Sequence, residues 1–341
     1  MKALIYKGPY EFSLSELPVP SPKPGELLIR VGAVGVCGSD VHGFAGKTGR
    51  REPGMVMGHE ISGTVAAIGE GVFSHQVGQR VVLQPILYCG NCEPCRKKMT
   101  SVCLNKKMIG VNMGVVGGLA EYIAVRASNA FPISADIPFA SAALVEPFAV
   151  GAGAVARSTV QPGETAAIVG AGMIGLAVLA MLKKRGVSRV YIVDQFKKKL
   201  DMAAKLGAIP VNFLEIDPLQ TIRAMTGGPG VDSSFEAVGV TQTVKLANSL
   251  AKTAGEIIWI GNSQRIIEVD MQEIVVQAKT IRGIYCYTDD DFRSAIQFVE
   301  DNPNLVAQFA EEKTDFRGAQ DLYTQLAKGE KDLFRGVVVI T

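Results

Sequence analysis

The stretch Ala166-Ala167-Ile168-Val169-Gly170-Ala171-Gly172-Met173-Ile174-Gly175 decides the fold of the second half of the chain. Its first four residues are small or β-branched and apolar, which predicts a buried strand. Glycines then follow in a G-x-G-x-x-G pattern, and residues 173–184 have the length and apolar period of a helix. A strand, a glycine-rich turn and a helix in this order are typical of a dinucleotide-binding βαβ unit.

The alternation of strands and helices continues beyond this unit. Residues 191–194, 233–236 and 256–260 predict further strands, and residues 197–206 predict a helix that ends at Gly207. Strands that alternate with helices form parallel sheets. We therefore expect an α/β fold here, a doubly wound parallel sheet of the Rossmann type.

Each residue of the glycine-rich turn has a predicted role in binding a dinucleotide. Gly170 makes the tight turn, Gly172 lets the backbone approach the pyrophosphate, and Gly175 lets the helix pack on the strand. The start of the helix, at Met173 and Ile174, offers N–H groups to the phosphates. Glycines that only punctuate a core βαβ unit would be the alternative explanation.

An acidic residue, Asp194, ends the second strand and lies 19 residues after Gly175. Dinucleotide-binding folds place such a residue about 20 positions on. A carboxylate there accepts hydrogen bonds from the adenosine ribose and repels a 2′-phosphate, so NAD is favoured over NADP. The basic run Lys197-Lys198-Lys199 argues the other way, unless it is only a solvated helix face.

Residues 1 to about 150 have a different character. Residues 27–31, 63–69 and 80–83 are short apolar runs bounded by glycine or proline, with no helical period. They predict a small all-β, barrel-like domain. After about residue 285 the pattern becomes mixed again and ends in a strand at residues 336–340.

Four of the six cysteines, Cys89, Cys92, Cys95 and Cys103, form a C-x2-C-x2-C-x7-C run. Four thiolates at this spacing can surround one tetrahedral zinc ion and leave no open coordination position, as in structural sites. Two disulfides would need an oxidising compartment, and a ferredoxin-type iron–sulfur cluster has a different spacing. The run therefore predicts a structural zinc in a loop of the first domain, residues 89–103.

A second group of ligand-type residues also lies in the first half of the chain. Cys37, His59 and a glutamate, Glu60 or Glu146, supply sulfur, nitrogen and oxygen ligands, and a catalytic zinc takes three such ligands. Two of the three histidines, His42 and His59, belong to this segment. Each residue alone would be a buried thiol or a hydrogen-bonded histidine, but the grouping predicts a catalytic zinc.

Composition excludes several classes of function. Apolar residues make up 48% of the chain and charged residues 20%, and the net charge is +2 with lysine and arginine scattered. Nucleic acid and anionic membranes are therefore not expected partners. Residues 1–7 show no signal-peptide pattern, so we expect a cytoplasmic protein with reduced cysteines.

Together, these motifs resemble the zinc-dependent medium-chain alcohol dehydrogenases, and within them the sorbitol/polyol dehydrogenase group. The matching segments extend over essentially the whole chain: Cys37-Gly38-Ser39-Asp40, Gly58-His59-Glu60, the cysteine run, Gly117-Gly118-Leu119-Ala120-Glu121-Tyr122, Glu146-Pro147 and the glycine-rich turn. The resemblance implies a GroES-like catalytic domain, residues 1–150 and 286–341, and a Rossmann domain, residues 151–285.

The resemblance also implies roles at the catalytic zinc. Cys37, His59 and Glu146 would be the ligands, and Glu60 would lie beside them and could exchange with a bound water. Asp40 would orient the imidazole of His59. A carboxylate at Glu146, where simple alcohol dehydrogenases place a cysteine, favours polyols as substrates.

Other residues take their expected roles from the same resemblance. Ser39 and His42 would relay the substrate proton to solvent, and Lys199 would reach the adenosine ribose. We expect two zinc ions per chain, one catalytic and one structural, with NAD as the second cofactor. A homodimer or homotetramer is the expected assembly.

This sequence departs from sorbitol dehydrogenases at two positions. Cys286 stands where an arginine is common, and Gly43 where a tyrosine is common; both changes are expected to alter the wall that contacts the polyol. Residues 48–51, Thr-Gly-Arg-Arg, would supply other polar contacts or would form only a basic surface turn.

The expected activity is the zinc-dependent transfer of a hydride from a secondary hydroxyl of a small polyol to NAD, which gives a ketose. Three alternatives stay open. The first is an L-threonine 3-dehydrogenase, and the second is a polyol-phosphate dehydrogenase in which Arg50 and Arg51 hold the phosphate of the substrate. A non-catalytic NAD-binding protein on the same fold is the third, although it would have no reason to keep the full ligand set.

Overall fold

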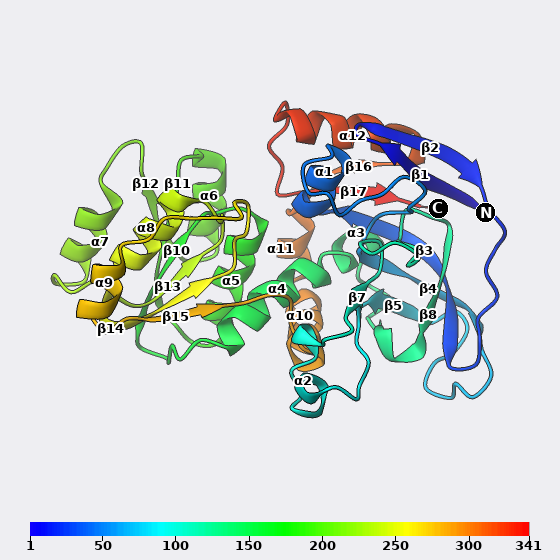
Figure 1. Ribbon diagram of the computed structural model, residues 1–341, viewed down its shortest axis with the longest axis horizontal. Coiled ribbons are helices and arrows are strands. Elements are labelled where there is room, and N and C mark those ends of the chain that lie inside the picture. The colour runs from blue at the N-terminus through cyan, green and yellow to red at the C-terminus, as the bar shows by residue number, and fades with distance from the viewer. Residues whose placement is uncertain (341) are drawn as a thin grey trace. The chain divides into compact units, whose positions relative to one another are not determined.

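The computed structural model describes residues 1–340, which form two compact units. Unit 1 contains Met1–Glu146 and the chain from Thr288 onward, and unit 2 contains Pro147–Tyr287. Both ends of the chain therefore belong to unit 1 (Figure 1). Unit 2 is a single continuous segment inserted between the two parts of unit 1.

Unit 2 is built on a six-stranded parallel sheet with strand order β12-β11-β10-β13-β14-β15. Counted within the unit, this is the order 3-2-1-4-5-6 of a doubly wound Rossmann sheet, as predicted. The strands are β10 (Thr165–Val169), β11 (Arg189–Asp194), β12 (Ile209–Asn212), β13 (Val231–Glu236), β14 (Ala251–Trp259) and β15 (Thr280–Gly283).

One helix of the Rossmann unit precedes its first strand, and the others connect successive strands. The helices are α4 (Val145–Ala156), which starts at the unit boundary, α5 (Met173–Lys184), α6 (Lys197–Lys205), α7 (Pro218–Met225), α8 (Thr241–Leu250) and α9 (Met271–Val276). An 18-residue window, Phe139–Ala156, is long and apolar enough to cross a membrane, but 83% of it is buried inside the protein, as in a core helix.

Unit 1 is organised around an antiparallel sheet with strand order β16-β17-β3-β4-β5-β9, in which β8 also pairs with β3 and only β16 and β17 are parallel. The strands are β3 (Glu26–Val36), β4 (Glu60–Ile68), β5 (Arg80–Leu83), β8 (Tyr122–Arg126), β9 (Ala130–Pro132), β16 (Ala310–Thr314) and β17 (Arg335–Val339). The last strand of the chain thus lies beside the third (Figure 1).

Two small sheets and several short helices complete unit 1. They are β1 (Lys2–Gly8) with β2 (Glu11–Glu16), β6 (Ile86–Leu87) with β7 (Lys107–Met108), and the helices α1 (Gly38–Phe44), α2 (Glu93–Arg96), α3 (Phe139–Ala142), α10 (Asp289–Asp301), α11 (Pro303–Ala307) and α12 (Phe316–Lys328). Short 3-10 turns lie at Thr100–Val102 and Ala127–Asn129.

An aromatic cluster fixes α1 in place. The rings of Phe12 and Phe44 stack with centroids 4.6 Å apart, and Tyr323 of α12 meets both rings edge-on at 5.2 and 5.4 Å. Phe44 and Tyr323 are fully buried. Aromatic side chains bury large apolar areas, so this cluster holds the C-terminal end of α1, at Phe44, in a fixed position.

Candidate active site and cofactor site

Strand pairing brings Cys37, His59 and Glu60, the ligand-type residues of the expected catalytic site, together. Cys37 follows the last residue of β3, and His59 precedes the first residue of β4, whose Glu60 pairs with Gly35. The ligand atoms of Cys37, His59 and Glu60 all lie within 4.8 Å of one another. Two neighbouring strand ends therefore create a compact sulfur, nitrogen and oxygen donor set.

A buried carboxylate, Asp40, contacts the Nδ1 side of the His59 ring. Asp40 Oδ2 lies 3.0 Å from His59 Nδ1, and Asp40 is completely buried. Burial acts to raise the Asp40 pKa, but the charges of His59 and Arg51 outweigh it and lower the pKa to about 2. Asp40 is thus an anion that holds Nδ1, and the imidazole keeps Nε2 for another partner.

Glu60 has its own partner, which comes from the other end of the chain. Arg335 Nη2 lies 3.1 Å from Glu60 Oε1, and its Nη1 donates to the Val36 carbonyl at 3.2 Å. Burial nevertheless raises the Glu60 pKa to about 8, although Arg335 acts to lower it. Sequence analysis missed Arg335; its only signal is a charged residue at the start of an otherwise apolar strand.

The donor set fits a metal cation. Both carboxylate oxygens of Glu60 are buried and, within residues 1–340, accept no hydrogen bond. Burial acts to raise the Cys37 pKa, but the neighbouring His59 outweighs it and lowers the pKa to about 6, which favours the thiolate. A thiolate, an imidazole and a carboxylate gathered in a buried site are the donors that zinc prefers.

The other predicted catalytic residues lie in the same unit, but not all join this cluster. Glu146 is buried in the first turn of α4, and its charge acts on Arg335; it is not part of the group within 4.8 Å. Ser39 and His42 are exposed on α1, and the Ser39 hydroxyl donates to Cys37 Sγ at 3.4 Å. No hydrogen bond joins Ser39 to His42 in the described chain.

Arg51 contradicts one expectation drawn from the sequence. Its side chain is 3% exposed, and Nη2 lies 2.5 Å from Asp40 Oδ1. Arg51 is therefore not a surface residue free to hold a phosphate, whereas Arg50 is exposed. Gly43 is also buried, and a Cβ atom there would meet Arg51 Cγ at 2.4 Å. The Arg51 side chain fills the space into which a side chain at position 43 would extend. Position 43 is therefore a glycine because of Arg51, not because of the substrate.

The four cysteines of the C-x2-C-x2-C-x7-C run meet in one lobe. Their sulfurs all lie within 4.8 Å of one another; Cys92 and Cys103 are 3.8 Å apart and Cys89 and Cys103 3.5 Å. All four are free thiols. Sulfurs 2.3 Å from a central zinc would be about 3.8 Å apart, so the lobe fits a tetrahedral ion. The Tyr88 hydroxyl donates to Asp289 Oδ2 at 3.1 Å and ties the lobe to α10.

The glycine-rich turn of unit 2 has the geometry expected of a dinucleotide site. Gly170 has φ +100°, and α5 begins at Met173 with Gly172 as its N-cap; Ile174 lies in the first turn. A Cβ atom at Gly175 would lie 1.8 Å from the Gly170 carbonyl oxygen, so only glycine allows this close packing.

Asp194 ends β11 beside that turn and is engaged by the backbone. The Ala171 N–H donates to Oδ2 at 2.7 Å, and the N–H groups of Gln195 and Phe196 donate to Oδ1 at 2.7 and 3.0 Å. Asp194 therefore also stabilises the turn, a role that sequence analysis did not predict. Lys199 Nζ lies 4.5 Å from the centroid of the Phe196 ring.

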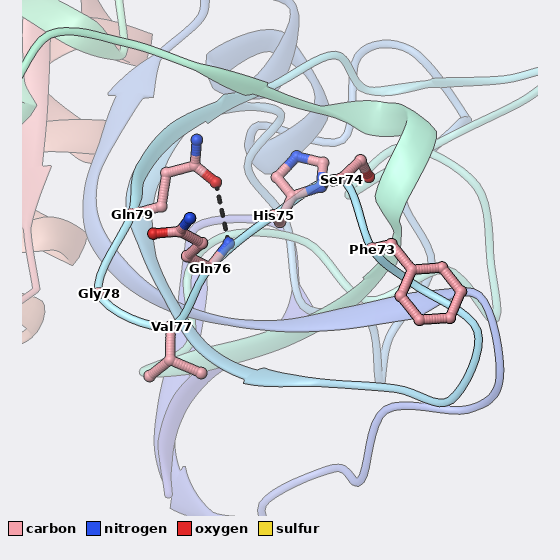
Figure 2. A pocket seen from close by; sticks show the side chains of 7 residues that line it. All are labelled: Phe73, Ser74, His75, Gln76, Val77, Gly78 and Gln79. Carbon is pink, nitrogen blue, oxygen red and sulfur yellow. Dashed lines mark hydrogen bonds between the residues drawn. The ribbon is translucent and has the colours of Figure 1, made fainter.

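The third histidine lies away from these groups. Figure 2 shows a surface hollow lined by residues 73–79 of the loop between β4 and β5. His75 Nε2 lies 3.0 Å from the Ala130 carbonyl oxygen and Nδ1 lies 2.9 Å from the Ser74 hydroxyl. Both ring nitrogens of His75 are thus occupied in holding the loop.

Two protein-family models match the chain. The alcohol dehydrogenase GroES-like domain matches residues 23–135, and the zinc-binding dehydrogenase model matches residues 174–301. Sorbitol dehydrogenase of Bacillus subtilis is 34% identical over 324 residues, with 92% of this chain and 91% of that protein covered. L-threonine 3-dehydrogenase of Bacillus subtilis is 34% identical over 291 residues, with 83% of each chain covered.

Solved structures agree over the whole chain. An Escherichia coli oxidoreductase of unknown specificity has a TM-score of 0.95 at 29% identity, with 100% of this chain and 99% of that chain covered. An alcohol dehydrogenase from Escherichia coli CFT073 in complex with NADH has a TM-score of 0.90 at 28% identity and 99% coverage of both chains. A zinc-binding dehydrogenase from Sinorhizobium meliloti bound to NADP has a TM-score of 0.91 at 27% identity, with 99% and 98% covered. The chain belongs to the zinc-dependent medium-chain alcohol dehydrogenases, enzymes that combine a GroES-like domain with a Rossmann domain and use zinc and a nicotinamide cofactor.

Proposed function

We propose that this enzyme oxidises a secondary hydroxyl of a small polyol to a ketose, with NAD as the hydride acceptor. The observation that carries the proposal is the meeting of Cys37, His59 and Glu60 at the ends of β3 and β4, with Asp40 behind the imidazole. A buried set of donors backed by a carboxylate is the arrangement that a catalytic zinc needs.

Cys37, His59 and Glu146 would hold the catalytic zinc, and the four-cysteine lobe would hold a structural one. Glu60, whose oxygens lie within 4.8 Å of the other ligand atoms, is the alternative carboxylate ligand. When bound, zinc would lower the pKa of the substrate hydroxyl and NAD would take up the hydride. His59 stays oriented because Asp40 holds its Nδ1.

Ser39 and His42 would carry the substrate proton to solvent. Ser39 lies beside the Cys37 sulfur, and both Ser39 and His42 are exposed on α1. Residues three positions apart on a helix lie on the same side of it, so His42 can receive a proton from Ser39 when a substrate reorders the hydroxyl.

NAD would bind at the glycine-rich turn of unit 2. Asp194 Oδ2 accepts one backbone N–H and keeps a further lone pair for a ribose hydroxyl, whereas Oδ1 already accepts two. Its negative charge opposes a 2′-phosphate, and Lys199, close to Phe196, would reach the adenosine ribose. The preference for NAD over NADP is part of the proposal, since related structures hold NADH or NADP.

The polyol class rests on the carboxylate at Glu146 and on the sorbitol dehydrogenase relative. Sorbitol itself is less favoured, because Cys286 replaces the arginine common in that group. L-threonine is the second candidate, since an L-threonine 3-dehydrogenase is also 34% identical, over 291 residues. The buried Arg51 gives no support to a phosphate site at residues 50–51.

A substrate panel tests the proposal. Purified enzyme is assayed by NADH absorbance with polyols, polyol phosphates, 2,3-butanediol and L-threonine. We expect the highest kcat/KM with an unphosphorylated polyol. Turnover of L-threonine alone would replace the polyol assignment by the threonine one, and no turnover by zinc-loaded enzyme would favour a non-catalytic NAD-binding role.

We also propose a homodimer or homotetramer in the cytoplasm. Strand β15 is an edge strand of the Rossmann sheet. Large apolar side chains in the segment that precedes it along the chain are exposed, among them Ile266, Met271 and Val276. An edge strand and exposed apolar residues both favour association of copies. Light scattering of the purified enzyme gives the assembly directly.

A further inference from the structure

Arg51 occupies space that Gly43 leaves empty. A Cβ atom at position 43 would lie 2.4 Å from Arg51 Cγ and 3.4 Å from its Nε. The first contact is far closer than two carbon atoms tolerate, so any larger residue at position 43 would displace the Arg51 stem. Both residues are buried.

The buried Arg51 side chain ends at the carboxylate that supports His59. Arg51 Nη2 lies 2.5 Å from Asp40 Oδ1, and the other oxygen of the same carboxylate lies 3.0 Å from His59 Nδ1. One carboxylate group thus connects a guanidinium on one side with an imidazole on the other. With one oxygen held by Arg51, the carboxylate cannot rotate without breaking a charge-assisted hydrogen bond.

We infer that Arg51 is a positioning residue for the catalytic zinc, which holds Asp40 so that His59 presents Nε2 to the metal, and that Gly43 is the residue that admits it. The inference rests on the zinc site proposed above. It gives both residues a role apart from the substrate wall. Partners that orient metal-binding histidines change metal affinity when they are removed, typically by about 10–100-fold.

The test uses zinc affinity at two sites of one protein. Holoenzyme is titrated with a competing chelator, and the catalytic site is then reloaded with cobalt, whose visible absorption reports ligand geometry. We expect Arg51→Ala to weaken the catalytic zinc by about 10-fold or more and to alter the cobalt spectrum. The zinc of the four-cysteine lobe should keep its affinity, which makes it an internal control.

Gly43→Ala tests the second half of the inference. In the wild-type background it should weaken the catalytic zinc, because the new Cβ displaces Arg51. In the Arg51→Ala background, where no Cγ remains to clash, it should add little, and this non-additivity is the signature of direct coupling. Arg317→Ala, which removes an exposed arginine from α12, is the matched control and should change neither site.

The outcomes separate cleanly. If folded Arg51→Ala has an unchanged zinc affinity and an unchanged cobalt spectrum, the inference is overturned. If the effects of Gly43→Ala and Arg51→Ala on zinc affinity are additive, the role of Gly43 is overturned. If Arg51→Ala does not fold, Gly43→Ala and Arg51→Lys decide by the same measurements, with Arg51→Lys expected to recover part of the affinity. A wild-type protein that binds only the lobe zinc overturns both the proposed function and this inference; two zincs with an unaffected variant overturn the inference alone.

Discussion

Arg335 Nη2 lies 3.1 Å from Glu60 Oε1 in the interior of unit 1. The two residues flank β3 from opposite sides, because β17 pairs with one edge of that strand and β4 with the other. Both side chains are nearly inaccessible to solvent, at 7% and 0% exposure. The last strand of the chain therefore supplies the positive charge beside the proposed zinc ligands.

Removal of this charge should destabilise unit 1. We expect Arg335→Met to cost about 3–5 kcal/mol at pH 9, because Glu60, with a pKa of about 8, is ionised in the wild-type pair and its carboxyl group would be left buried without a partner. The cost should fall at pH 6, since the carboxyl then carries a proton. Urea denaturation at both pH values measures it. Arg335→Met with Glu60→Gln should recover stability; if it does not, the pair is not coupled.

Metal analysis should find two zinc ions per chain with separable roles. We expect His59→Ala to keep one zinc and to bind NAD normally, but to lose turnover. Cys95→Ser should lose the other zinc and lower the melting temperature, because the lobe would lack one of its four thiolates. Elemental analysis, calorimetry and NAD titration give the three readouts. A single zinc in metal-replete wild-type protein would remove one of the two site assignments.

Asp194 should set the choice of cofactor. We expect Asp194→Ser to narrow the ratio of kcat/KM for NAD over NADP, since it removes a charge that repels the 2′-phosphate. NAD itself should also bind less well, because the Ala171 N–H loses its acceptor. Asp201→Ala removes an exposed charge from α6 and is the control. A higher kcat/KM with NADP than with NAD in the wild-type enzyme would contradict this interpretation.

Asp232 should make the stability of the Rossmann unit depend on pH. Burial acts to raise its pKa, but hydrogen bonds from Lys252 and Thr165 outweigh burial and lower it. A lowered carboxyl pKa stabilises the fold above the unfolded value of about 3.9, and this contribution is lost as the pH falls through the folded value. Asp232→Asn should therefore cost about 1.5–3 kcal/mol at pH 7.

The difference between wild type and Asp232→Asn should shrink below about pH 4, where Asp232 takes up a proton in the unfolded chain before it does so in the folded one. Urea unfolding at several pH values follows the difference. Asp290→Asn changes a carboxylate on the first turn of α10 in unit 1 and is the comparison variant. If the difference in the free energy of unfolding stays constant down to pH 3, the charge on Asp232 contributes nothing to stability.

Cys286 should influence substrate choice and not cofactor affinity. It has φ +59°, a left-handed conformation that is rare for a side chain other than glycine. We expect Cys286→Arg to change relative kcat/KM among polyols, with NAD affinity nearly unchanged. Cys286→Ser keeps the size of the side chain and should leave the order of substrates as it is. An identical polyol profile in both variants and wild type contradicts the prediction.

The sequence by itself determined the local elements. The strand at β10, the glycine-rich turn and α5 were predicted almost to their ends, since strand propensity, glycine geometry and helical period act over a few residues. The cysteine lobe was predicted for the same reason, because its four ligands lie in one short loop. The zinc-dependent dehydrogenase family followed from these motifs together.

Only the tertiary structure decided which charges meet inside unit 1. Arg335 reaches Glu60 because β3 aligns the end of the chain with its beginning, and such register depends on burial of whole strand faces. Arg51 reads in the sequence as part of a basic surface turn, yet it folds inward over Gly43 to Asp40. No spacing rule encodes that contact, because it depends on the space left by a glycine in a neighbouring helix and on the cost of burying an unpaired carboxylate.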